Sequence, residues 1–115
     1  LRVVGKTLLQ SLRAGDYAGR IGGEEFALIL PQTSLKAVFQ VSEKLRKTLN
    51  ELKLETPQGE SIKITVSAGC TSRESQDLTE NKLVLRADQA LYQAKSNGRN
   101  RSEIFNNTDN SPKCI

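Results

Sequence analysis

Apolar residues recur at steps of three and four positions in three parts of the chain, and this spacing predicts three amphipathic helices. The first helix closes near Gly15, the second follows Pro31, and the third ends at Asn97-Gly98. The residues expected to face inward are Leu1, Val4, Leu8 and Leu12 in the first helix, Leu35, Val38, Val41, Leu45, Leu49 and Leu52 in the second, and Val84, Ala87, Leu91 and Ala94 in the third.

Two of these helices are preceded by side chains that can cap them. Thr33 or Ser34 can accept a hydrogen bond from the first turn of the second helix, and Asp77 or Thr79 can do so for the third. Residues 106–115 follow the last periodic segment and are expected to form a flexible tail.

Other patterns predict β-structure. Residues 17–21 and 26–30 flank Gly22-Gly23, an arrangement typical of a β-hairpin. Residues 62–68 alternate between apolar and polar side chains, which predicts a half-buried strand, and residues 102–105 can add a short edge strand. The resulting order of elements predicts an α+β fold in which helices cover a largely antiparallel sheet.

Composition narrows the class of protein. The 115 residues have the length of one domain, and 37% hydrophobic with 26% charged residues is typical of a soluble globular chain. No apolar run approaches the roughly 20 residues that a membrane span needs, so we expect no membrane contact from this segment. Cys70 and Cys114 lack metal-type spacing, which favours a reduced, cytoplasmic protein.

Composition also limits the chemistry. The chain has no histidine, which excludes histidine-based acid–base catalysis, and it has no cysteine cluster for zinc. The net charge is +4 and aromatic residues make up 4%, so a nucleic-acid-binding α+β domain has only the mild positive charge in its favour. A ligand that carries phosphate groups fits the charge at least as well.

The Gly-Gly turn carries an unusual amount of negative charge. Gly22 and Gly23 permit positive φ and leave the main chain open to a ligand. We expect Glu24 and Glu25 on an extended segment, with Glu24 facing the open side and Glu25 finding a partner elsewhere. A carboxylate beside exposed amides suits a divalent cation that also holds phosphate oxygens. The alternative is an ordinary polar hairpin with solvated glutamates, which is the commoner reading of an isolated Gly-Gly-Glu-Glu.

A second candidate cluster lies at the end of the third helix. Lys95 ends this helix and Arg99 follows the Gly98 stop. A lysine and an arginine together suit phosphate oxygens. The alternative is the ordinary preference of cations for a helix C-terminus, and taken alone that preference explains both residues.

The combination of these segments resembles a known family. RIGGEEF, FALILP, VSAG and ALYQAKSNGRN, in this order and at these separations, are similar to the GGDEF domain of diguanylate cyclases, in its GGEEF variant. The similarity runs from Leu1 to about Phe105. It implies a sheet and covering helices like those of nucleotidyl cyclase and polymerase palm domains. It also implies a signalling enzyme that condenses two GTP into cyclic di-GMP, with release of pyrophosphate, between two domains that face each other as a homodimer.

The resemblance assigns a role to each matching residue. Gly22-Gly23 would border the GTP phosphates and the guanine-side pocket. Glu24 would hold Mg²⁺ (or Mn²⁺) and activate the attacking 3′-hydroxyl, and Glu25 would be the second signature acid in the catalytic site. Lys95 and Arg99 would grip the terminal phosphates.

A second motif of the family also has a counterpart here. Arg13 and Asp16 stand at the spacing of the RxxD inhibitory site, which binds the product cyclic di-GMP. The family often adds an arginine from the following helix, where this chain has Lys44, with Arg46 two residues later. Lysine cannot make the bidentate guanine contact that arginine makes. We therefore expect product inhibition, but the sequence does not predict its strength. The alternative is a local helix-end ion pair between Arg13 and Asp16.

Part of the family's pattern has no counterpart in this sequence. The strand that carries a second metal-ligating Asp, and the Asn and Asp that read guanine, would precede Leu1. We therefore interpret residues 1–105 as a partial GGDEF domain, inactive by itself, and favour a fragment of a longer protein with an upstream sensor domain over a natural partial domain. That protein would be cytoplasmic or the cytoplasmic part of a membrane-anchored one. The alternative function is a non-catalytic GGDEF module that binds cyclic di-GMP or GTP as a receptor.

Overall fold

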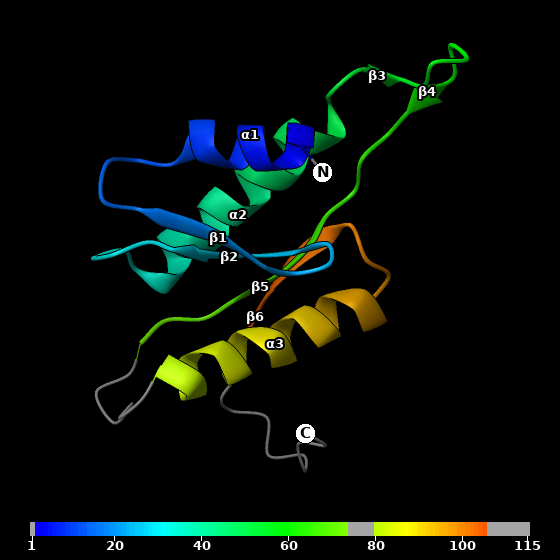
Figure 1. The fold of residues 1–115 in the computed structure, drawn as a ribbon. Helices are drawn as coiled ribbons and strands as arrows, with labels where there is room; N and C mark the ends of the chain where they lie inside the picture. The colour runs from blue at the N-terminus through cyan, green and yellow to red at the C-terminus, as the bar shows by residue number, and fades with distance from the viewer. Residues whose placement is uncertain (1, 74–79, 106–115) are drawn as a thin grey trace. The chain divides into compact units, whose positions relative to one another are not determined.

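The computed structural model describes residues 2–73 and 80–105 (Figure 1). The expected caps Asp77 and Thr79 and the expected tail lie outside the described residues. The chain divides into two compact units, Leu1–Thr33 and Ser34–Ile115, and each is described by itself because their relative position is not determined. The elements are α1 (Arg2–Ser11), β1 (Tyr17–Gly22), β2 (Glu25–Ile29), α2 (Leu35–Asn50), β3 (Leu54–Glu55), β4 (Ser61–Ile62), β5 (Ser67–Cys70), α3 (Glu80–Ser96) and β6 (Arg101–Ile104).

The first unit consists of α1 and a β-hairpin. Leu8 on the expected inward stripe of α1 is buried, and Gly15, beyond the end of the helix, has a positive φ of 92° that favours glycine. β1 and β2 pair antiparallel, and the register shifts between Arg20 and Gly22. The predicted hairpin is therefore confirmed, and it closes on the Gly-Gly-Glu-Glu segment.

α2 opens the second unit as the apolar spacing predicts. The Ser34 side chain accepts a hydrogen bond from the main-chain N–H of Ala37 at 3.2 Å, so Ser34 caps the helix. Leu45 and Leu49 on the predicted stripe are buried. The inward face of α2 is thus fixed by its sequence.

The single strand expected at residues 62–68 is wrong. The chain there divides between two partners: β4 pairs antiparallel with β3, and β5 pairs in parallel with β6. The turn before β4 explains the division, because Gly59 takes a positive φ of 85° and its N–H donates to the carbonyl of Thr56 at 2.8 Å. This turn commits Ser61 and Ile62 to a short hairpin, and the backbone then changes partner before Ser67.

The described strands form three separate pairs, so one largely antiparallel sheet is also a wrong expectation. β5 and β6 run parallel because α3 connects them, and they lie between α2 and α3 (Figure 1). The α+β class itself is confirmed. None of the helices in the described part of the chain is both long and apolar enough to cross a membrane.

α3 packs closely on β5 through small residues. A Cβ atom added to Gly69 would lie 2.2 Å from the carbonyl oxygen of Ala87, so only glycine lets the helix approach this strand. Ala90, which lies beside Gly69, and Ala94 are buried, whereas Val84 is 51% exposed. The inward position predicted for Val84 is therefore wrong: the fully buried positions in the described part of this helix are the small residues Ala90 and Ala94.

Candidate active site

The Gly-Gly-Glu-Glu segment is a tight two-residue turn. Gly22 and Glu25 are paired across the hairpin, and Gly23 and Glu24 connect them. Gly23 has a φ of 44°, which fits a type II′ turn with glycine at its first central position. Arg20 Nε donates to the carbonyl oxygen of Gly23 at 2.8 Å. The side chain of Arg20 therefore holds the turn from the strand that leads into it.

Both glutamates are exposed at this turn. Glu24 is a turn residue and only Glu25 begins a strand, which corrects the expectation that both stand on an extended segment. The partner expected for Glu25 is absent, because neither carboxylate forms a hydrogen bond or ion pair with another residue in the described ranges. A Cβ added to Gly22 or Gly23 would meet no atom within 4 Å. The turn therefore presents two unpaired carboxylates beside open main chain.

The acidic residues at this turn do not make a metal cage. Across residues 2–73 and 80–105, no three His, Cys, Asp or Glu side chains gather closely enough to hold a metal ion. Mg²⁺ in proteins is commonly held by one or two carboxylates together with substrate phosphates and water. The exposed carboxylate of Glu24 fits one position in such a shared ligand set.

Lys95 and Arg99 stand at the C-terminal end of α3. The helix closes in a Schellman arrangement: the N–H of Arg99 donates to the carbonyl of Ala94 at 2.9 Å, and Gly98 has a φ of 116°. This confirms the predicted stop. Both cationic side chains are exposed, and neither forms a hydrogen bond or ion pair with another residue in the part of the chain that the structure describes. Two free cations at one helix end can share a polyanionic ligand.

Arg13 and Asp16 are paired with each other. The main-chain N–H of Arg13 donates to Asp16 Oδ2 at 2.9 Å, and Arg13 Nε donates to the same oxygen at 3.3 Å. These contacts lower the pKa of Asp16, the main-chain hydrogen bond most of all. Arg13 also donates to Thr33 Oγ1 at 2.7 Å, and its side chain is 66% exposed. The structure therefore shows the local ion pair and leaves the guanidinium open to solvent.

The predicted site residues fall into the two units. Gly22 to Glu25 and the Arg13–Asp16 pair belong to the first unit, whereas Lys44, Lys95 and Arg99 belong to the second. The structure pairs Arg13 with Asp16 and Gly22 with Glu25. It does not fix how the groups lie relative to one another.

Comparison with known proteins identifies the family. The family model described as "Diguanylate cyclase, GGDEF domain" matches residues 1–101. The chain belongs to the GGDEF domain family. Its signature turn, Gly22 to Glu25, is the segment for which the family is named, in the GGEEF form.

Named relatives and solved structures agree with this assignment. Diguanylate cyclase DgcP of Pseudomonas aeruginosa is 42% identical over 104 residues, covering 90% of this chain and 15% of the relative. The GGDEF domain of DgcB from Caulobacter crescentus, solved in complex with c-di-GMP, has a TM-score of 0.84 at 32% identity, covering 90% of this chain and 61% of that one. The active GGEEF domain of a diguanylate cyclase from Vibrio cholerae has a TM-score of 0.83 at 33% identity, covering 94% and 67%.

The GGDEF chain described here spans only part of these proteins. It covers 28%, 15% and 30% of the length of three curated relatives from Bacillus subtilis, Pseudomonas aeruginosa and Treponema denticola. Activity, substrates and partners of a whole protein therefore do not follow from the match alone.

One cluster of this GGDEF chain was not predicted from the sequence. Glu43 and Arg46 on α2 are joined to Asn100 and Ser102, which directly precede and form part of β6. A Glu and an Arg three positions apart on a predicted helix are a recognisable pairing signal, and Asn100 directly follows Arg99. Nothing in the periodicity indicates that the two segments meet.

Proposed function

We propose that this chain is part of a diguanylate cyclase domain that, in the intact protein, condenses two GTP into cyclic di-GMP. The observation that carries the proposal is the open Gly-Gly turn with two unpaired carboxylates in a chain of the GGDEF family. A receptor module would not need both acids, and a structural hairpin would need neither. The named diguanylate cyclases among the relatives support the same activity.

The proposed reaction consists of two successive nucleotidyl transfers. In each, the 3′-oxygen of one GTP attacks the α-phosphorus of the other, the bond to the β-phosphate oxygen breaks, and pyrophosphate leaves. Glu24 is proposed to accept the proton of the attacking hydroxyl, since its carboxylate is exposed and has no protein partner in the described ranges. Gly22 and Gly23 leave room for phosphates beside the main chain. Glu25 adds the second negative charge of the turn.

The remaining charges suit the rest of the substrate. We assign Lys95 and Arg99 to the terminal phosphates, because both are exposed cations at one helix end. Glu24 would also be a ligand of Mg²⁺ or Mn²⁺, which when bound neutralises phosphate charge during the transfer. Alignment of two substrates supplies much of the rate, so we propose that two such domains face each other as a homodimer. We propose that the reaction takes place in the cytoplasm, where GTP is supplied. An upstream sensor domain would control how the two domains pair.

We also propose that cyclic di-GMP inhibits the enzyme through Arg13 and Asp16, with Lys44 from α2. The exposed guanidinium of Arg13 supports this, because it can turn from Asp16 to an anionic ligand. Asp16, whose side chain is covered and accepts the main-chain N–H of Arg13, would keep Arg13 beside the ligand. Lys44 is exposed on α2 and provides a point charge where an arginine would provide a fork.

The decisive experiment replaces the Glu24 carboxylate in the intact protein. Glu24→Gln is expected to lower cyclic di-GMP formation by at least about a hundredfold, a typical loss for a general base, while circular dichroism stays unchanged. Glu60→Gln, at another exposed carboxylate, is the matched control and should retain the rate. Product would be measured by chromatography after incubation with GTP and Mg²⁺. A Glu24→Gln protein with normal turnover would contradict the proposed function.

A further inference from the structure

Glu43 and Arg46 form a two-pronged ion pair on α2. Arg46 Nε donates to Glu43 Oε2 at 2.8 Å, and Arg46 Nη2 donates to Glu43 Oε1 at 3.0 Å. Their side chains are only 25% and 17% exposed, respectively, so this is not a solvated surface pair. A bidentate pair with both partners partly covered has a fixed geometry. It can therefore act as a rigid support for whatever it contacts.

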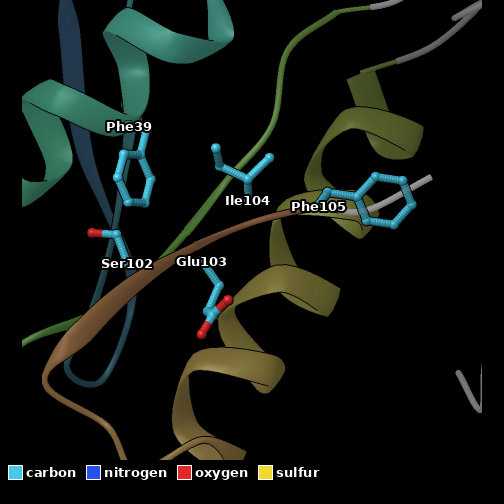
Figure 2. A pocket seen from close by; sticks show the side chains of 5 residues that line it. All are labelled: Phe39, Ser102, Glu103, Ile104 and Phe105. Carbon is cyan, nitrogen blue, oxygen red and sulfur yellow. The ribbon is translucent and has the colours of Figure 1, made fainter. Parts of the chain in front are cut away.

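The pair is attached to the segment that follows α3. Glu43 Oε2 accepts the main-chain N–H of Ser102 at 3.1 Å, and Arg46 Nη1 donates to Asn100 Oδ1 at 3.1 Å. Figure 2 shows Ser102 and Glu103 pointing to different sides of β6. Glu103 on its side accepts a hydrogen bond from Asn97 Nδ2 at 3.1 Å. The turn between α3 and β6 is thus tied at Asn100 to α2 and at Asn97 to β6.

This turn has a backbone that residues with a side chain rarely adopt. Arg99 and Asn100 follow Gly98 with φ values of 64° and 48°, so three consecutive residues lie at positive φ. Asparagine tolerates the left-handed region, but arginine gains nothing from it. Such conformations persist where surrounding contacts hold them, and they cluster at functional sites. Arg101 Nε of β6 donates to the carbonyl of Arg99 at 3.2 Å, and the contact that reaches the strained segment from α2 is the one from Arg46 to Asn100.

We propose that Glu43, Arg46 and Asn100 are positioning residues that hold Arg99 in the orientation needed to bind the terminal phosphates of GTP. The inference rests on the function proposed above. Glu43 fixes the guanidinium of Arg46, Arg46 fixes the amide of Asn100, and the left-handed backbone at Asn100 and Arg99 sets the direction in which the Arg99 side chain leaves the chain. α2 thereby acts on the phosphate site without touching the substrate.

Direct phosphate binding by Arg46 is the competing explanation. All three guanidinium nitrogens of Arg46 already donate to Glu43 or Asn100, and its side chain is largely covered. Arg99, in contrast, is exposed. The geometry therefore assigns ligand contact to Arg99 and support to Arg46.

The test uses the intact protein and two probes, inorganic tripolyphosphate for binding and GTP for turnover. Arg46→Ala and Asn100→Ala should each weaken tripolyphosphate affinity and raise the KM for GTP about fivefold, with kcat within about twofold, because a ground-state contact is lost. The double variant should be no weaker than Arg46→Ala, because both residues act through the same contact. Titration calorimetry and steady-state kinetics give the two readouts.

Two further variants make the result decisive. Ser42→Ala removes the hydrogen bond between the hydroxyls of Ser42 and Ser102 at the same α2–β6 contact and leaves Asn100 untouched, so it should keep wild-type affinity. An equal loss in Ser42→Ala, or additive losses in the double variant, would overturn the positioning role. Arg99→Ala separates the two proposals. If Arg99→Ala weakens affinity but Arg46→Ala does not, only the positioning role fails; if Arg99→Ala has no effect, the phosphate role proposed for Arg99 fails as well.

Discussion

A Cβ atom added to Gly69 would lie 2.2 Å from the carbonyl oxygen of Ala87 and 2.3 Å from the main-chain nitrogen of Leu91. Both atoms belong to the backbone of α3, so neither can move aside as a side chain would. Gly69→Ala is expected to lower the free energy of unfolding by about 1–3 kcal/mol or more, the usual cost of overpacking. Urea unfolding followed by circular dichroism measures it.

Gly19 provides the matched control for this substitution. It also lies in a strand, but an added Cβ would meet no atom within 4 Å. Gly19→Ala should change the free energy of unfolding by no more than about 0.5 kcal/mol. Equal effects at the two glycines would show that α3 does not approach β5 as closely as described.

Single residues were predictable where the reason is local. Ser34 caps α2 and Gly98 ends α3 because caps and stops depend on the residues beside them. Val84 was mispredicted because the part of α3 that packs on β5 is set by Gly69, which lies beside Ala87, Ala90 and Leu91 and which the periodicity of the helix does not contain. The partner expected for Glu25 was wrong because strand alternation gives the direction of a side chain and not its partner; the alternative of solvated glutamates matches its exposure.

At the scale of elements, α2 and β6 are joined by a charge that depends on pH. The guanidinium of Arg46, and then the hydrogen bonds from Ser102, lower the pKa of Glu43 from 4.5 to about 2 despite partial burial, which opposes the shift. Because the folded pKa lies below the unfolded one, ionised Glu43 stabilises the fold fully above about pH 4.5, and this contribution is lost as the pH falls to about 2.

We therefore expect Glu43→Gln to reduce the dependence of unfolding free energy on pH between about 4.5 and 2. Thermal unfolding of both proteins across this range gives the slopes. Glu51→Gln, which removes a charge from the exposed end of α2 without breaking a contact to β6, should retain the wild-type slope. Parallel curves for wild type and Glu43→Gln would contradict the role of the ion pair.

Elements were predictable where one period runs through them, as in α2 and in the hairpin. The expected strand at 62–68 failed because alternation does not say which neighbour a strand pairs with. Ser61 and Ile62 pair with β3, whereas Ser67 to Cys70 pair with β6, far along the chain.

At the scale of the whole molecule, the charges of the proposed site are divided between two units. Residues 1–115 alone are expected to make no cyclic di-GMP, because catalysis needs two substrates aligned between two facing domains. The purified chain would be incubated with GTP and Mg²⁺ and the products separated by chromatography, with the intact protein as positive control. Repeated turnover by the chain would contradict this prediction.

The family could be recognised from the sequence because its motifs occur in a fixed order. The position of the signature turn relative to Lys95 and Arg99 could not be predicted from the sequence. It depends on how two separate units pack, and no local pattern records that. The hydrogen bond from Arg46 to Asn100 could not be predicted from a local pattern either, because it joins residues more than fifty positions apart.

The parallel pairing of β5 and β6 has a consequence for folding during synthesis of the protein on the ribosome. The 17 residues of α3 separate the two strands, so the ribosome releases β6 only after the rest of this pair and its covering helix have been made. Until then Glu43 and Arg46 have no Ser102 or Asn100 to bind, and the turn that carries Arg99 lacks its support. The segment of the signature hairpin is thus synthesised before the turn that we propose to bind phosphates, so binding of nucleotide at that turn would have to wait until synthesis of this region is finished.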